Sequence, residues 1–403
     1  MDDRFGGFFV HAVKSIYCQK VKAPVCRLYL SVKKSKRKLG AAWVTDQFIS
    51  VLCLVVGQET IYMAVHLVPW DPSHNLLEEA NRLYDEAGTF DCIQKGDLVA
   101  IKLHVGELGN PYYVQPFFVN DLARRVKEAG GKPFLTDSST LYTGQRSNGY
   151  DHTINALTNG FNMAPFFPAD GLKSENYRTI PTKGILNEIE VSGMIAEADA
   201  MIVVSHDKGH ELSGFGGAIK NLGMGCTPAA GKLRQHRVVG LEIDESKCVG
   251  CGKCKAICAQ HLPEIIEGKA HNTSRLCMRC PMCKHGCPME AISFIDQDNF
   301  CKALASAAYG VLSTFNPKKV SFVSFAKDIT ANCDCLPMPG EPVMKDVGIF
   351  ASDSAVSIDG AFLESIDYKM FNDASHVDCM LQVREAKALG LEGDVKPKIT
   401  KLV

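Results

Sequence analysis

The chain has 403 residues, of which 46% are hydrophobic and 22% charged, a composition typical of globular proteins with one large or two to three ordinary domains. Lys and Arg total 44 against 45 Asp and Glu, so a net charge of −1 gives no electrostatic reason to expect nucleic acid or an anionic membrane as a partner. Seventeen cysteines are many for this length. Because the first residues do not resemble a signal peptide, we expect a reducing, cytoplasmic setting in which cysteines bind metal rather than form disulfides.

Residues 1–62 differ from the rest of the chain. They contain a basic run at 33–38 and a ten-residue apolar run at 48–57, which is short of the roughly 20 residues that a membrane-spanning helix needs. We interpret 1–62 as an extension, either a mis-called start, with Met63 as the natural first residue, or a poorly ordered segment.

From Leu98 onward, short apolar runs of strand length alternate with helical patterns. Strands are predicted at 98–105, 200–206, 320–326 and 346–352, and 132–139 is predicted to be a strand followed by a loop. Helices are predicted at 114–131, from 191 to 199, after the glycine-rich loop at 216–225, at 301–312 and at 375–390. In the first helix one apolar face should hold Phe118, Leu122, Val126 and Ala129. The alternation predicts an α/β fold with a doubly wound, mostly parallel sheet.

Two cysteine runs interrupt this alternation: "CVGCGKCKAIC" at 248–258 and "CMRCPMCKHGC" at 277–287. Each follows the spacing C-x-x-C-x-x-C-x-x-x-C, and in two-cluster ferredoxins the fourth cysteine of each run ligates the other cluster. The spacing therefore predicts two 4Fe–4S clusters. One would be held by Cys248, Cys251, Cys254 and Cys287, and the other by Cys277, Cys280, Cys283 and Cys258.

Two other interpretations of the cysteine runs stay open. Zinc sites also use paired Cys-x-x-Cys segments, although the third Cys-x-x step in each run is poorly explained by zinc. The clusters could also serve as structural staples only. Gly250, Gly252 and Gly286 give the room that backbone N–H groups need to approach the sulfurs.

The cysteine runs resemble bacterial-type two-cluster 4Fe–4S ferredoxins; Pro288 follows the second run as in that pattern, whereas Ala259 follows the first. From Met63 onward the chain resembles domain-of-unknown-function family 362, iron–sulfur proteins of anaerobic bacteria and archaea, through "VAIKLHVGELGN", "FLTDSS", "VVSHDKGHELSGFGGAIKNLGMG", "CDCLPMPGEPVMKDVGIFAS" and "VSIDGA". This resemblance implies an α/β domain in two parts, 63–241 and 298–403, with an α+β ferredoxin-like insert at 242–297.

The segment "HELSGFGGAIK" is similar to the part of nickel-pincer lactate racemases that carries a metal-binding histidine and the lysine that tethers the cofactor. This similarity implies His210 as a ligand and Lys220 as the attachment point. The remaining histidines of that family have no counterpart here, since "FLTDSS" lacks the one expected after its strand.

Polar side chains follow several predicted strands, and open α/β sheets bind ligands at such strand ends. Candidates for a catalytic or ligand-binding role are Lys102, His104, Asp137, His206, His210 and Lys220, with Glu107, Ser138, Ser139, Asp207, Lys208 and Asn221 nearby. The glycine-rich loop before the 218–225 helix predicts free N–H groups for an anion. A structural histidine at 104 and a capping aspartate at 137 are the simpler alternatives.

Three further cysteines raise a metal or pocket interpretation. Cys333 and Cys335 lie two residues apart in "CDC", and Cys226 follows "GMG". Two thiols without further ligands do not make a metal site, so free thiols are the preferred interpretation for all three.

Three functions are consistent with the sequence. The first is an electron-transfer protein or oxidoreductase that relays single electrons between a redox partner protein and either a second protein or a small-molecule or anionic substrate in the α/β crevice. The second is a non-redox enzyme or small-molecule binder that uses His210 and Lys220, and the third is a docking scaffold. No G-x-G-x-x-G fingerprint of a dinucleotide site is present.

Overall fold

The computed structural model describes residues 64–272 and 274–402. Its largest element is an eight-stranded sheet in the order β16-β1-β15-β14-β7-β2-β3-β4. Within the described residues β15 runs against the other seven strands, so the sheet is mixed but largely parallel. The strands are β1 (Val65–Pro69), β2 (Leu98–Lys102), β3 (Lys132–Asp137), β4 (Phe166–Pro168), β7 (Ala200–His206), β14 (Val320–Ala326), β15 (Gly348–Ser352) and β16 (Ile399–Lys401).

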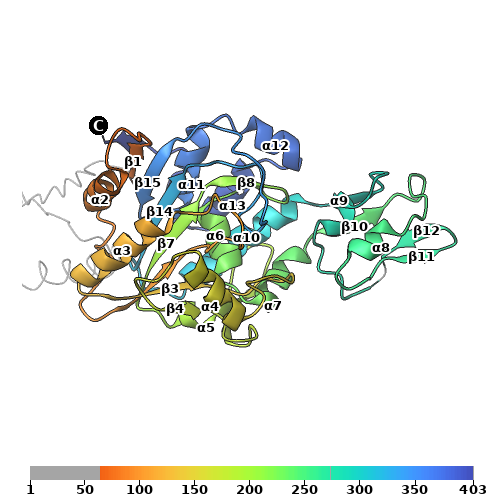
Figure 1. Cartoon of the computed structure of the whole chain (residues 1–403), viewed down its shortest axis with the longest axis horizontal. Coiled ribbons are helices and arrows are strands. Elements are labelled where there is room, and N and C mark those ends of the chain that lie inside the picture. Colours follow the sequence, from red (N-terminus) through yellow and green to blue (C-terminus); the bar gives the residue numbers. More distant parts are fainter. Residues whose placement is uncertain (1–63, 273, 403) are drawn as a thin grey trace, which may run out of the picture. The chain divides into compact units, whose positions relative to one another are not determined.

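Helices cover both faces of the sheet, and each face has its own hydrophobic core (Figure 1). Neighbouring residues of one strand alternate between the two cores: Met201 and Val203 of β7 belong to one, Ile202 and Val204 to the other. The first core is closed by α6 (Ala218–Gly225), α10 (Asp298–Leu312), α11 (Ala355–Glu364) and α13 (Met380–Ala388). The second is closed by α2 (Leu76–Glu86) and α3 (Pro116–Glu128). The predicted α/β class is confirmed.

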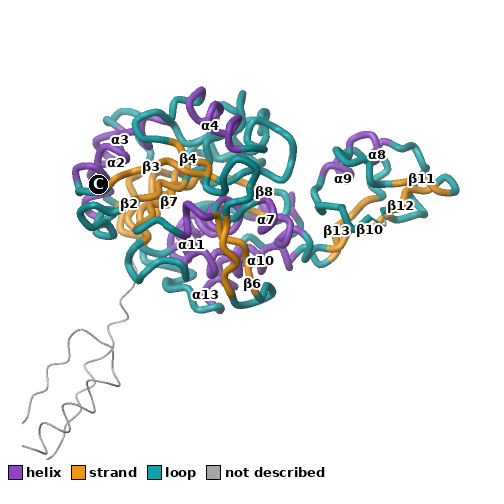
Figure 2. Tube along the Cα trace, turned by 90° about the horizontal axis from the view of Figure 1, so that it is seen from below, coloured by secondary structure: helices purple, strands orange, loops and turns teal. Residues whose placement is uncertain are grey.

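Strands β2 and β7 mark the point where the chain changes direction across the sheet. From β2 the chain continues through α3 to β3 on one side, whereas β7 pairs with the other side of β2 and then with β14. Figure 2 shows β2, β3, β4 and β7 lying together. Loops at the carboxyl ends of such strands form a crevice at the point of reversal, and most of the polar candidates follow these strands.

The predicted elements agree with the structure in type, and several differ in length. Strand β7 has the predicted bounds. The helix predicted at 114–131 is shorter, because Gln115 is its N-cap and Ala129 its C-cap, and Ala129 is exposed rather than on the buried face. The helix predicted over 191–199 is reduced to α5 (Gly193–Ala196), since Val191 is paired in β6 (Glu188–Ser192). The extension predicted for 1–62 lies outside the described residues.

Further helices and short strands complete the part of the chain around the sheet. The helices are α4 (Gly149–Thr158), α7 (Ala229–His236) and α12 (Lys369–Ser375). The strand pairs are β5 (Tyr177–Pro181) with β6, and β8 (Lys208–His210) with β9 (Gly214–Gly216). No helix in the described ranges combines the length and apolar character that crossing a bilayer requires.

The cysteine runs lie between two paired strands outside the large sheet, β10 (Gly240–Ile243) and β13 (Ile292–Ile295). Between them come α8 (Lys253–Ile257), the hairpin of β11 (Glu264–Ile266) and β12 (Lys269–His271), and α9 (Met282–His285). A small core of its own contains Cys248, Cys254, Cys283, Ala270, Ala291 and Ile292. We call residues 240–295 the cysteine block.

Candidate functional site

Four cysteines line one hollow in the cysteine block. The hollow measures about 330 Å³, counting its open mouth, and its cysteines are Cys248, Cys251, Cys254 and Cys287. The backbone N–H of Ala270 donates to Cys248 Sγ (3.3 Å), and that of Ala291 donates to Cys287 Sγ (3.4 Å). The rest of the lining is mostly apolar, with Ile243, Val249, Ile265, Met289, Ala291 and Ile292 among its residues. The hollow therefore brings the first three cysteines of one run together with the last of the other.

The remaining four cysteines form a second group beside the first. Burial, and then the neighbouring thiols, raise the pKa of the Cys283 thiol to about 12; these thiols are Cys280, Cys277, Cys254 and Cys258. Cys258 also raises the pKa of Cys280. The last cysteine of the first run thus lies among the cysteines of the second, and Cys254 lies near both groups.

Gly250 is the tightest glycine of the first run. Its φ is +65° and a Cβ there would lie 2.3 Å from the carbonyl oxygen of Gly268, whereas Gly252 has a φ of +73° with open space around it. We expect Gly252→Ala to lower the free energy of unfolding by about 1–2 kcal/mol, the cost of a left-handed backbone. Gly250→Ala should lower the free energy of unfolding by clearly more and should also lower the metal content. The reason is that the turn at Gly268, just before β12, must also move. Denaturant titration and metal analysis of both variants check this, and equal losses would contradict it.

Contacts join the cysteine block to loops of the α/β part. His285 Nε2 lies 2.7 Å from Glu211 Oε2, and Arg237 Nη2 donates to the carbonyl of Arg275 (2.9 Å). Burial lowers the pKa of His236 to about 4. A hydrogen bond between His236 and the backbone of Arg279, which lies inside the second cysteine run, opposes this shift. The His236 ring in turn packs on Phe300 at 5.0 Å between centroids. The second cysteine run therefore faces α7 and the loop that carries Glu211.

At the carboxyl edge of the large sheet, Lys102 and Asp137 form a buried ion pair. Lys102 Nζ lies 3.0 Å from Asp137 Oδ1 and donates to Asn221 Oδ1 (2.6 Å) and to the Leu103 carbonyl (3.0 Å). The two side chains are 1% and 4% exposed. Burial alone would raise the pKa of Asp137, but Lys102 first, then His152 and Arg146 among others, hold it well below its usual range. The predicted capping role of Asp137 is thus wrong in part: its Oδ1 accepts the N–H of Ser138, but its main partner is a lysine.

His206 and Lys208 meet one carboxylate, Asp334. Its Oδ1 lies 2.8 Å from His206 Nδ1, and its Oδ2 lies 3.1 Å from Lys208 Nζ. Burial would raise the pKa of Asp334, yet His206 and Lys208 lower it far below the usual range. Because Asp334 stands between Cys333 and Cys335, this ion-pair group fixes the loop that carries both thiols.

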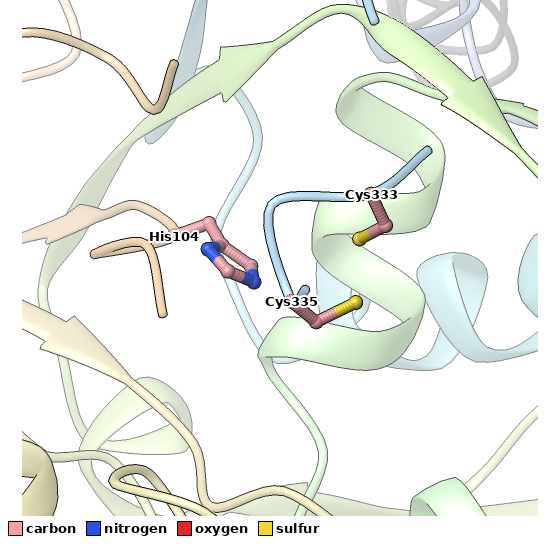
Figure 3. A group of neighbouring side chains, drawn as sticks. All are labelled: His104, Cys333 and Cys335. Carbon is pink, nitrogen blue, oxygen red and sulfur yellow. The ribbon is translucent and has the colours of Figure 1, made fainter. Parts of the chain in front are cut away.

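Cys333, Cys335 and His104 come together at this edge. One sulfur from each cysteine and one ring nitrogen of His104 all lie within 4.8 Å of one another. Figure 3 shows the His104 ring turned toward the two sulfurs, which project from the loop between β14 and β15. Lys220 of α6 is the fourth member, with its Nζ 3.7 Å from Cys333 Sγ. Both thiols are free, as predicted. The structure adds a third possible ligand, His104, from a distant part of the chain.

We call Cys333, Cys335, His104 and Lys220 the thiol–imidazole cluster. Its surroundings shift the pKa values of the two cysteines in opposite directions. A hydrogen bond from Cys335, followed by Lys220 and Lys208, lowers the pKa of Cys333 well below its ordinary value despite burial. The same bond and burial raise the pKa of Cys335 well above it. Burial, then Arg146, lowers the pKa of His104, so its imidazole is neutral. Cys333 is therefore the more acidic of the two thiols, and it lies beside a neutral imidazole.

Two of the candidates from the sequence, His210 and Cys226, are not members of the thiol–imidazole cluster. His210 Nδ1 lies 2.9 Å from Ser213 Oγ, and its ring stacks on Phe300 at 6.3 Å between centroids. Burial, and then the charge of Lys220, lower the pKa of His210, so the two predicted residues lie within electrostatic range of each other. Among the described contacts none joins the His210 ring to the thiols. Cys226 is fully buried in the first core.

The anion site predicted at the start of α6 is filled by the protein itself. Asp359 of α11 accepts the N–H of Ala218 at Oδ1 (2.6 Å) and that of Ile219 at Oδ2 (2.9 Å). The prediction of free N–H groups is therefore wrong. The reason is long-range: the carboxylate comes from a helix 140 residues further along the chain.

Asp359 should make stability depend on pH. Burial, and then Asp207, raise the pKa of Asp359 from 3.8 to about 8 against the two N–H donors. The unfolded chain then binds fewer protons than the folded one between these values, so stability falls as pH rises from about 4 to about 8, by at most about 1.4 kcal/mol per pH unit. Asp359→Asn should flatten this fall. Thermal unfolding midpoints of both proteins at pH 5, 6.5 and 8 check it; parallel curves would contradict it.

Sequence reasoning missed the loop after β3. Arg146, 3% exposed, pairs with Glu107 (3.0 Å) and lies 3.8 Å from Asp137. Its Nη2 donates to Tyr142 Oη (2.5 Å), and both side chains influence Cys335. The one available signal was position, because this loop follows the carboxyl end of a sheet strand next to the switch point.

The fold and these contacts define the class of the protein: an α/β protein with a thiol- and lysine-bearing site at the carboxyl edge of its sheet and a separate cysteine block. The chain belongs to the family described as Domain of unknown function (DUF362), whose model matches residues 99–364. That range contains the carboxyl-edge site and the cysteine block.

Other similarities are more distant. The chain is 26% identical over 163 residues to "Thylakoid-associated protein sll1697" of Synechocystis sp.; the match covers 39% of this chain and 47% of that protein, so the chain spans about half the length of this relative. The lactate racemase apoprotein from Thermoanaerobacterium thermosaccharolyticum has 12% identity and a TM-score of 0.36, over 73% of this chain and 55% of that one. A Thermotoga maritima protein solved by structural genomics has 12% identity and a TM-score of 0.38, over 77% and 61%.

Proposed function

We propose that the protein is an electron carrier in which the eight cysteines of the block hold two 4Fe–4S clusters and the α/β part receives or supplies the electrons. The observation that carries this proposal is the hollow lined by Cys248, Cys251, Cys254 and Cys287. The spacing of the two runs requires this crossed set if each cube takes its fourth ligand from the other run. When bound there, the clusters would supply one-electron oxidation and reduction.

The residues around the cysteines suit this role. N–H groups of Ala270 and Ala291 donate to two of the sulfurs, which stabilises negative charge on the thiolates. Asn272 does the same for Cys277, with its Nδ2 3.1 Å from the sulfur. Hydrogen bonds to the sulfurs and the apolar lining are both determinants of the potential.

Two observations favour a relay over a structural role alone. His285 and Arg275 contact the α/β part. Val249 and Met289 line the hollow and have 61% and 44% of their surface accessible, so the cysteines of the hollow lie beside accessible apolar side chains. A redox partner protein is the partner that this function requires.

Anaerobic purification of the full chain tests the proposal. We expect about eight iron and eight sulfide per chain, and an electron paramagnetic resonance (EPR) signal of reduced 4Fe–4S clusters after dithionite addition. About one zinc for each four-cysteine set, with no such signal, would overturn it.

A further inference from the structure

A second metal-binding geometry is present outside the cysteine block, at the carboxyl edge of the sheet. Its three donor atoms are the sulfurs of Cys333 and Cys335 and a ring nitrogen of His104, all within 4.8 Å of one another. They come from two loops, one after β2 and one between β14 and β15, so that no local turn accounts for their meeting. We propose that these three residues bind a divalent ion of the zinc type and leave one coordination position open.

The donor set selects the class of ion. Two thiolates and an imidazole are soft and borderline ligands, which suit zinc and disfavour magnesium or calcium. A tetrahedral zinc ion with bonds of about 2.3 Å to sulfur and about 2.0 Å to nitrogen sets its ligand atoms about 3.5–3.8 Å apart. The three donor atoms lie within 4.8 Å of one another, so ligation requires them to approach by little more than about 1 Å. Three protein ligands of the Cys₂His type with an open fourth position are typical of catalytic rather than structural zinc.

Metal binding requires the His104 ring to change its tautomer. Its Nδ1 accepts the backbone N–H of Gly106 (3.0 Å), so the neutral ring carries its proton on Nε2. An ion bound at Nε2 replaces that proton, and Nδ1 then takes up a proton and gives up the bond from Gly106. Losing one neutral hydrogen bond costs little beside the free energy with which such ligands hold zinc.

Neighbouring charged residues fix the loop that carries the two cysteines and favour a negatively charged ligand at the open position. Asp334, between the two cysteines, is anchored by His206 (2.8 Å) and Lys208 (3.1 Å), which fixes the loop as outer-shell partners do around metal ligands. Lys220 lies 3.7 Å from Cys333 Sγ and has no carboxylate partner among the described residues. A positive charge beside a metal with an open position favours an anionic fourth ligand, such as a substrate carboxylate.

Metal analysis of the full-length protein, purified anaerobically and then incubated with zinc alone, tests the site. We expect one zinc per chain in addition to the iron of the block. Zinc-edge X-ray absorption should give two sulfur neighbours at about 2.3 Å and a nitrogen at about 2.0 Å. Cys333→Ala with Cys335→Ala should abolish this zinc, and His104→Gln should weaken its binding at least tenfold in competition with a chelator. Iron content should be unchanged, which separates this site from the cysteine block.

The matched control is Cys301→Ala with Cys379→Ala, which should keep the zinc. Both cysteines are fully buried, and Cys379 belongs to the first core. The zinc-edge X-ray absorption measurement uses the unaltered protein, so its result does not depend on whether any variant folds. Three results would overturn the proposal: no zinc uptake by the unaltered chain, equal uptake by the Cys333/Cys335 variant, or a Cys333–Cys335 disulfide in the anaerobically purified protein.

Discussion

Replacing Cys248 and Cys287 together by alanine should leave one 4Fe–4S cluster intact, with about four iron per chain instead of about eight. Both cysteines line the same hollow, so the double change removes two ligands from one cluster and none from the other. Replacing Cys248 and Cys258 together should instead remove one ligand from each cluster, because Cys258 lies among the thiols of the second run. No cluster should then keep four thiolate ligands.

The two pairs differ only in which fourth cysteine is changed, so each is the control for the other. Iron analysis and EPR of the reduced proteins distinguish them: an unaltered 4Fe–4S signal should survive in the first pair and be absent from the second. The reverse pattern would mean that each run closes its own cluster, against the crossed arrangement. Cys92→Ala, at a buried cysteine of the second core, should keep the full iron content.

Lys102→Met should lower the free energy of unfolding by about 3–5 kcal/mol, because it removes one partner of a buried ion pair and leaves the other charged. Lys102 has three partners and a side chain only 1% exposed. Without it, Asp137 keeps the N–H of Ser138 and two more distant basic side chains, Arg146 at 3.8 Å and His152 at 3.7 Å. Anaerobic urea titration followed by circular dichroism measures the loss.

Lys132→Met, at an exposed lysine of β3, is the matched control and should change stability by less than about 0.5 kcal/mol. A loss below about 1 kcal/mol for Lys102→Met would contradict the account. Its effect should also depend on pH. The pKa of Asp137 is depressed, so its stabilising contribution is present above the ordinary aspartate range and is lost as pH falls through the lower, folded-state value.

The sequence predicted the sheet and the gathering of several candidates well, because both follow from local patterns. The apolar run at 200–206 is long enough to determine a buried strand, and side chains after parallel strands must meet at one edge. Lys102, Asp137, His104, Lys220 and the His206 group do lie at this edge. Strand β1 and helix α2 were missed, since the regular pattern was recognised only from Leu98 onward.

What the sequence did not predict depends on contacts between distant segments. Nothing near Cys333 and Cys335 indicates that His104 faces them, and nothing near Ala218 indicates that Asp359 fills the start of α6. Likewise Arg146 reads as an ordinary loop residue until the fold buries it beside Glu107. Such pairings are determined by how the layers pack, not by local spacing.

The most direct test of the proposed relay is an anaerobic coulometric titration of the full-length protein, followed by EPR. Two clusters that carry electrons should take up and return about two electrons per chain, reversibly, with the 4Fe–4S signal appearing and disappearing in step. A chain that takes up no electrons while its iron content stays complete would contradict the relay and assign the cysteine block a structural role.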